Sequence, residues 1–160
     1  MNFSENNDTN SAQVYQEDKT LEEMFLKTTG RLNRLRYLKR GILLMIVPLL
    51  LSLPFAVVFS DSMGNLTAKG EIIVAIINLV MLFPGYCLDV RRLHDMDKDD
   101  TLAKINFVLS VVVIFSGSGD PFEFSTSELI VSLLIIVILI YMLFVPGTNG
   151  ENKYGPDPLG

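Results

Sequence analysis

Charge-free apolar runs constrain this chain more than any other feature of its sequence. Residues 41–60 form a run of 20 residues without a charged side chain. A helix that rises about 1.5 Å per residue needs about 20 residues to cross a hydrocarbon core of about 30 Å. Two further uncharged runs, residues 72–88 and 129–145, hold 17 residues each. Because lipid cannot hydrogen-bond an open backbone, these runs predict membrane-spanning helices.

A fourth apolar run is interrupted by a charge. Lys104 lies near its start, so that only residues 105–115 form a continuous stretch that suits the membrane core. Eleven helical residues reach about 17 Å, so this segment either spans with Lys104 extended to the head groups or enters and leaves on one side. We expect an all-α polytopic membrane protein, a four-helix transmembrane bundle with spans at about 41–60, 71–88, 102–117 and 128–145.

Helix-breaking and polar residues inside these runs favour a packed bundle over separate helices. Pro48, Pro54 and Pro84 each remove a backbone hydrogen bond and leave a carbonyl free. Asn78, in the middle of the second run, needs a hydrogen-bond partner as well. We expect neighbouring helices or local geometry to satisfy the freed carbonyls. For Asn78 we expect a hydrogen bond to another helix, with a place on a substrate path as the alternative.

Basic residues mark one side of the predicted bundle. Residues 27–40 hold six of them and residues 89–104 hold four, whereas residues 61–71 hold one and residues 117–128 hold none. Since lysine and arginine favour the cytoplasmic side, we expect a multi-pass protein with both termini inside. The expected partners are the bilayer, anionic head groups at the cytoplasmic face, and a protein partner or a second copy of the chain. The net charge of −5 gives no support to nucleic-acid binding.

Three parts of the chain lie outside the spans. Residues 1–19 are polar without an apolar period, which predicts a disordered tail before a single membrane domain of residues 20–160. Residues 20–40 intersperse basic and apolar side chains and predict an interfacial helix, weakened by Gly30. A basic anchor explains this segment more simply than a ligand site does. Residues 146–160 are rich in proline and glycine, which predicts a cytoplasmic turn-rich segment folded back on the helix ends.

A charged cluster, DVRRLHDMDKDD, separates the second and third spans. If the second helix continues through it, Asp89 and Arg92 are three residues apart, as are Arg92 and Asp95, and Arg91 and Asp95 are four apart. This spacing predicts a ladder of ion pairs. Exposed pairs of this kind contribute only a few tenths of a kcal/mol each, so we interpret the cluster chiefly as registration of the helix end and basic anchoring.

Metal binding is the competing interpretation of the same cluster. Asp95 and Asp97 begin an alternation typical of a calcium-binding EF-hand loop, but the sixth and twelfth positions hold Asp100 and Asn106 in place of glycine and glutamate. A looser site formed by His94, Asp95 and Asp97 stays open. His94 is the only histidine, so the sequence predicts no catalytic residue and no cofactor.

Three stretches together carry a family resemblance: TGRLNRLRYL with Gly30, Arg31 and Arg34, then RRLHD, and then the C-terminal segment with Asn152 and YGPDP. The chain resembles the bacterial "domain of unknown function 805" family of small inner-membrane proteins over roughly residues 22–158. The resemblance implies a location and an architecture, and it implies no reaction. After Asp95 the sequence departs from the family pattern, because no tryptophan follows.

All three stretches fall on the expected cytoplasmic face, where we predict that they meet. We expect Asp157 or the turn backbone near Asn152 to accept hydrogen bonds from Arg31, Arg91 or Arg92. The predicted signature cluster comprises Gly30, Arg31, Arg34, Arg91, Arg92, His94, Asp95, Asn152, Gly155 and Asp157. We favour a non-enzymatic scaffold or regulatory protein that acts through its cytoplasmic face. The alternatives are a small transporter or channel subunit and a metal- or phosphate-binding enzyme at the cytoplasmic membrane surface.

Overall fold

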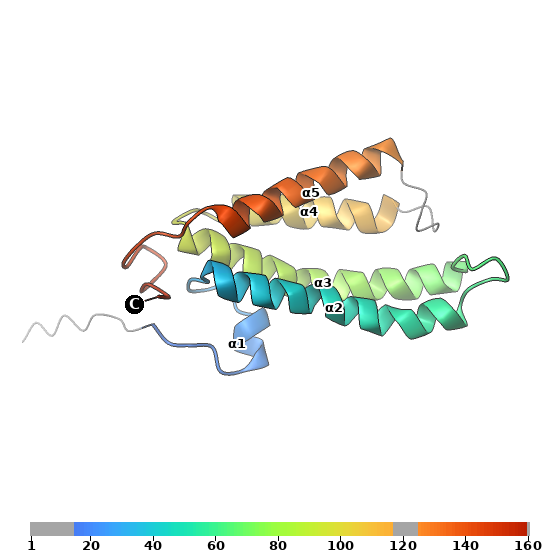
Figure 1. Ribbon diagram of the computed structural model, residues 1–160, viewed down its shortest axis with the longest axis horizontal. Coiled ribbons are helices and arrows are strands. Elements are labelled where there is room, and N and C mark those ends of the chain that lie inside the picture. The colour runs from blue at the N-terminus through green and yellow to red at the C-terminus, as the bar shows by residue number, and fades with distance from the viewer. Residues whose placement is uncertain (1–14, 117–124, 160) are drawn as a thin grey trace, which may run out of the picture.

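A computed structural model of the chain describes residues 15–116 and 125–159, and these residues form an all-α protein. Figure 1 shows its five helices: α1 (Leu21–Phe25), α2 (Arg34–Val58), α3 (Ala68–Asp95), α4 (Thr101–Ser116) and α5 (Thr126–Phe144). Three of them, α2, α3 and α5, are long and apolar enough to cross a membrane, and α4 is a shorter apolar helix. The chain is therefore a multi-pass membrane protein, as the apolar runs predict.

The long helices form two antiparallel hairpins that lie side by side. One hairpin pairs α2 with α3 and the other pairs α4 with α5 (Figure 1). The short helix α1 and the C-terminal segment lie at the same end of the molecule, beside the start of α2 and the end of α3. We call this end the cap: residues 15–33, the helix end and turn at 88–100, and residues 145–159.

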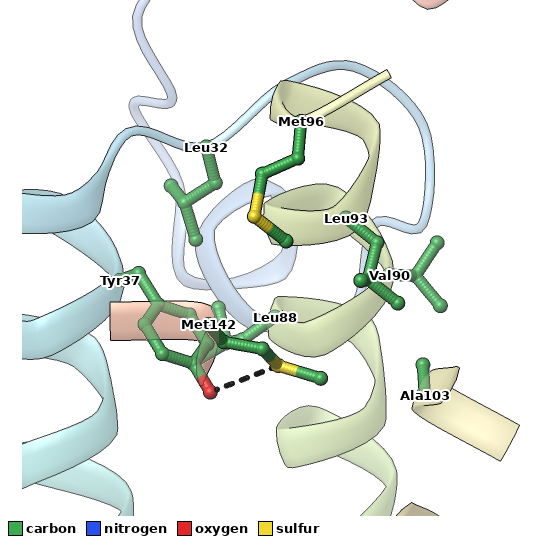
Figure 2. Close-up of a cluster of buried hydrophobic side chains, with 8 residues drawn as sticks. All are labelled: Leu32, Tyr37, Leu88, Val90, Leu93, Met96, Ala103 and Met142. Atoms are coloured by element: carbon green, nitrogen blue, oxygen red, sulfur yellow. Dashed lines mark hydrogen bonds between the residues drawn. The ribbon is translucent and has the colours of Figure 1, made fainter. Parts of the chain in front are cut away.

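The apolar side chains along the long helices face outward, whereas those of a soluble helix bundle face its interior. Large aliphatic residues stay exposed along the length of α2, α3 and α5, which suits helices that face lipid. The buried apolar cluster lies instead at the cap and at the helix turns next to it (Figure 2), where it comprises Leu32, Tyr37, Leu88, Val90, Leu93, Met96, Ala103 and Met142. The cap is thus the part of the protein packed like the interior of a soluble domain.

The helices begin where side chains satisfy their free N–H groups. The Asn33 side chain accepts from the N–H of Arg36 at 2.9 Å and starts α2, and Thr67 caps α3. Ser125 and Glu128 form a reciprocal capping box at the start of α5. Such caps stabilise a helix by about 1 kcal/mol.

Three expectations about local structure are wrong or fall outside the described residues. Residues 20–40 are not one helix, because α1 ends at Phe25 and α2 begins at Arg34, and the chain turns between them at Gly30 with φ of +83°. Asn78 donates to the carbonyl of Val74 in its own helix, at 2.9 Å, and not to a neighbouring one. Most of the predicted disordered tail, residues 1–14, lies outside the described residues, whereas Asp18 at its end is buried.

Leu93→Ala is expected to destabilise the protein strongly, because Leu93 is fully buried in the cap cluster, at 0% exposure. Truncating a buried leucine typically costs about 2–5 kcal/mol. The measurement is the thermal reaction of Cys87, a free and buried thiol, with a fluorogenic maleimide in mild detergent. Leu35→Ala is the matched control, since Leu35 is 60% exposed, and equal shifts in the two variants would contradict a core located at the cap.

Candidate functional site

The centre of the cap is one carboxylate held between two guanidinium groups. Arg31 Nε donates to Asp95 Oδ1 at 3.2 Å, and Arg92 Nη1 pairs with Asp95 Oδ2. The three residues are 2%, 0% and 4% exposed for Arg31, Arg92 and Asp95. One buried anion therefore faces two buried cations, and the second positive charge needs further acceptors.

Backbone carbonyls at the end of α5 supply acceptors for Arg92. Its Nε donates to the carbonyl of Met142 at 2.6 Å, and its Nη2 donates to the carbonyl of Val145. The last carbonyls of a helix have no partner within the helix, and they carry the negative end of its dipole. Arg92 of α3 thus fixes the end of α5.

The C-terminal segment supplies acceptors for Arg31. Its guanidinium donates to the carbonyls of Thr148 and Gly150 and reaches the carbonyl of Gly155 at 3.4 Å. The backbone of the C-terminal turns therefore accepts hydrogen bonds from Arg31, as we expected from the sequence. Asp157 does not take part, because it accepts from the N–H groups of Leu159 and Gly150, which lower the pKa of its carboxyl.

Two residues outside the predicted cluster complete the attachment of this segment. The N–H of Thr148 donates to the backbone carbonyl of Asp95 at 2.8 Å. A Cβ added at Gly147 would fall on the Asp95 carboxylate, so only glycine fits there. The glycine itself is visible in the sequence, but the carboxylate against which it packs is 52 positions earlier in the chain (147 − 95).

His94 has a structural arrangement and not that of a metal ligand. Its ring stacks on Tyr154 with centroids 3.8 Å apart, and its Nδ1 lies 3.3 Å from the carbonyl oxygen of Gly30. Asn152 donates to the carbonyl of His94 at 2.9 Å. These contacts join all three sequence stretches that carry the family resemblance.

The three candidate metal ligands do not converge. Asp95 is occupied by two guanidinium groups, whose charge opposes a cation. Asp97 is exposed, with Lys153 Nζ at 3.8 Å. Within residues 15–116 and 125–159 no three His, Cys, Asp or Glu side chains are grouped so that they could hold a metal ion.

The predicted ion-pair ladder is wrong at two of its three steps. Arg92 and Asp95 pair as expected, but Arg91 pairs with Asp18 at 2.8 Å. Asp89 accepts from the hydroxyl of Tyr37 at 2.9 Å and from the amide of Asn106 at 2.7 Å. The two pairs that do form, Arg92 with Asp95 and Arg91 with Asp18, are buried. The few tenths of a kcal/mol expected of an exposed pair therefore do not describe their contribution to stability.

Asp18 is a buried, ion-paired residue of the cap that the sequence pattern did not indicate. It is 7% exposed and pairs with Arg91 and with Arg40, at 2.8 Å in each case. Burial alone would raise the pKa of its carboxyl, but the hydrogen bonds and charges of Arg91 and Arg40 outweigh burial and lower that pKa below its ordinary value of 3.8. A lone aspartate in a polar stretch carries no periodicity that would reveal these partners.

The structure brings nine of the ten predicted signature residues into the cap. Arg34 is the exception, because it lies exposed on the first turn of α2. Arg91 shares the cap but points to the N-terminal segment, through Asp18 and through the carbonyl of Glu23 at 2.9 Å. The cap therefore has two sides, one tied to the C-terminal segment and one to the N-terminal segment.

Comparison with known proteins agrees with the resemblance of the three stretches. Residues 25–156 match the family described as "Protein of unknown function (DUF805)". The chain belongs to the DUF805 family. It is also 28% identical over 79 residues to "Uncharacterized protein YiiR" of Escherichia coli strain K12, and equally to that of E. coli O157:H7.

The similarity to YiiR is partial. It covers 48% of this chain and 54% of either relative, so the chain spans about half the length of the curated relatives it matches. No solved structure matches the chain. Arg31, Arg92 and Asp95 lie inside the DUF805 match, whereas Asp18 precedes it. The C-terminal side of the cap thus falls within the family region as far as residue 156.

Arg31→Ala is expected to release the C-terminal segment, because it removes the donors to the carbonyls of Thr148, Gly150 and Gly155. Cleavage by trypsin at the exposed Lys153 should become about tenfold faster, since proteolysis follows local opening. The measurement is intact mass against time in detergent. Arg34→Ala should leave the rate unchanged, and a segment cut equally fast in the parent protein would contradict its attachment.

Acid should remove the contribution of Asp18 to stability. A carboxyl whose folded-state pKa is lowered stabilises the protein above its unfolded pKa, and this stabilisation is lost as the pH falls through the folded pKa. The melting difference between the parent protein and Asp18→Asn should therefore be fully present at about pH 7, begin to shrink as the pH falls below about 4, and vanish once the pH is below the lowered folded-state pKa. A difference that persists unchanged in acid would show that the Asp18 charge contributes nothing.

Proposed function

We propose that this DUF805 protein is a non-enzymatic scaffold or regulatory protein of the bacterial cytoplasmic membrane that acts through its cap. In this proposal α2 to α5 cross the bilayer as a four-helix bundle with the N-terminus, the C-terminus and the cap in the cytoplasm. The concentration of lysine and arginine at the cap supports this orientation. The 16 residues of α4 reach about 24 Å, which a locally thinned bilayer accommodates.

One observation supports the functional part of the proposal: Asp95, Arg92 and His94 use their polar atoms in contacts that hold the cap together. Both oxygens of Asp95 face guanidinium groups. The ring of His94 is stacked, with its Nδ1 beside a backbone carbonyl. A general acid or base needs an atom within reach of a substrate proton, whereas groups committed to internal contacts favour a fixed platform for a partner.

The outer surface of the cap and the adjoining first turns of α2 provide charges for recognition. Arg34 and Lys39 are exposed at the start of α2, and Asp97, Lys98 and Asp99 are exposed in the turn after α3. Mixed charges of this kind steer and select a partner more than they add affinity. A cytoplasmic protein, a second copy of the chain and anionic head groups are the proposed partners.

A groove between the hairpins favours a small transporter as the second candidate. A cavity of about 180 Å³ contains Asp89, Asn106 and Ser110 in its lining. It shares Ser110 with a cavity of about 260 Å³, which in turn shares Asn78 with one of about 350 Å³ that reaches Glu71. Polar side chains thus recur along the bundle, as a transport path needs.

Single cysteines test the orientation. In a Cys87→Ser background, Met63→Cys places a thiol in the loop between α2 and α3, where Met63 is 86% exposed, and Asp99→Cys places one in the exposed turn of the cap. An impermeant maleimide should label Met63→Cys in intact cells and Asp99→Cys only after lysis. Labelling of Asp99→Cys in intact cells would place the cap outside and overturn the proposal.

A photo-crosslinker at position 99 tests the scaffold function. The proposal predicts discrete protein adducts from position 99 and none from position 63. It also predicts that Arg31→Ala loosens the cap and abolishes these adducts, while Cys87 stays protected from maleimide and so shows that the protein is still folded. Adducts that survive Arg31→Ala unchanged, or no adducts above background in cells, would contradict a platform held by the buried pairs. A protein that is strictly monomeric in mild detergent would disfavour the transporter.

A further inference from the structure

We propose that a cavity on the N-terminal side of the cap binds a phosphate group. The cavity has a volume of about 340 Å³, and its lining comprises Tyr15, Gln16, Asp18, Lys27, Gly30, Arg31, Arg91 and Pro156. It lies between the N-terminal segment, the turn before α2 and the end of α3, away from the groove between the hairpins. The inference needs only the fold of the cap, so it stands or falls separately from the scaffold function.

Two residues that line this cavity, Tyr15 and Arg91, each have a buried polar atom without a partner among the residues that the structure describes. Arg91 is 2% exposed, and it uses Nη1 and Nη2 on the Glu23 carbonyl and the Asp18 carboxylate. Its Nε and the hydroxyl of Tyr15 have no hydrogen-bond partner within the described part of the chain. An unsatisfied buried group costs about 1–3 kcal/mol, and a ligand oxygen that accepts hydrogen bonds would satisfy an Nε–H or a tyrosine hydroxyl after a small movement of either side chain.

The charges that line the cavity also favour an anion. Lys27, Arg31 and Arg91 bring three positive charges to it, and Asp18 is the one carboxylate in its lining. That carboxylate is already paired with Arg91 and with Arg40. The partner of Arg31, Asp95, is shared with Arg92. Positive charge therefore exceeds negative charge in a partly buried space, which a bound anion would balance.

The shape and donors fit a phosphate group better than a small halide. The space exceeds that of a single water molecule many times over, and arginine N–H groups match the oxygens of phosphate in spacing and plane. Gly30 presents no side chain to the cavity, and nothing lies within 4 Å of the position its Cβ would take. Because the cap adjoins the apolar helices, the phosphate comes either from a lipid head group or from a soluble phosphorylated molecule.

The experiment uses the full chain with two probes. Inorganic phosphate is titrated into protein in uncharged detergent at constant ionic strength, and phosphatidylcholine nanodiscs are compared with and without phosphatidic acid, with the thermal exposure of Cys87 as the readout. Tyr15→Phe and Lys27→Gln should each lower the apparent affinity for the probe, as judged from its stabilising effect, about tenfold. Neither should lower the melting temperature without a probe, because Tyr15 loses a hydroxyl that has no partner among the described residues and Lys27 is exposed.

Lys39→Gln is the matched control, because Lys39 is exposed on α2 and does not line the cavity. Binding of inorganic phosphate that Lys27→Gln weakens and Lys39→Gln leaves intact would support a site for soluble phosphate compounds. Binding seen only with phosphatidic acid, and with the same dependence on the variants, would support a head-group site. Failure of both probes, or an equal loss in Lys39→Gln, would overturn the proposal in favour of general surface charge.

Discussion

The cap depends on a single buried carboxylate that two arginines share. Asp95 neutralises part of the charge of Arg31 and Arg92, and each arginine then uses its remaining donors on a different segment. Arg92 holds the end of α5, and Arg31 holds the C-terminal segment. Removing one partner of a buried pair leaves an uncompensated charge, which typically costs about 3–5 kcal/mol. The helix ends and the C-terminal segment are therefore coupled through Asp95.

The buried ion pairs of the cap hold the helix hairpins together, which apolar packing between the spans cannot do in a membrane. Between helices surrounded by lipid the hydrophobic effect provides no driving force, because lipid tails are as apolar as leucine. In this chain the packed apolar cluster lies at the cap, and cavities that contain Asn78 and Ser110 separate the hairpins farther along. The cap thus fixes the two hairpins at one end and leaves a groove between them.

The sequence predicts what depends on local pattern and misses what depends on distant contacts. The charge-free runs predict α2, α3 and α5 because length and hydropathy are local properties. A spacing of three residues on a helix placed Arg92 beside Asp95 correctly. The preceding residue, Arg91, points about 100° around the helix from Arg92 and reaches Asp18, 73 positions earlier. The candidate metal ligands do not converge for a similar reason, because the Asp95 carboxylate is also paired with Arg31, which lies 64 positions earlier in the chain.

Amide hydrogen exchange of the C-terminal segment tests the attachment of the cap most directly. The N–H of Thr148 donates to Asp95, and the N–H groups of Asn152 and Gly155 donate across their own turn. In nanodiscs a peptide covering residues 146–157 should exchange at least about a hundredfold more slowly than an unstructured peptide. Exchange at the rate of an unstructured peptide would mean that the segment is not held, and that Asp95 does not organise the cap.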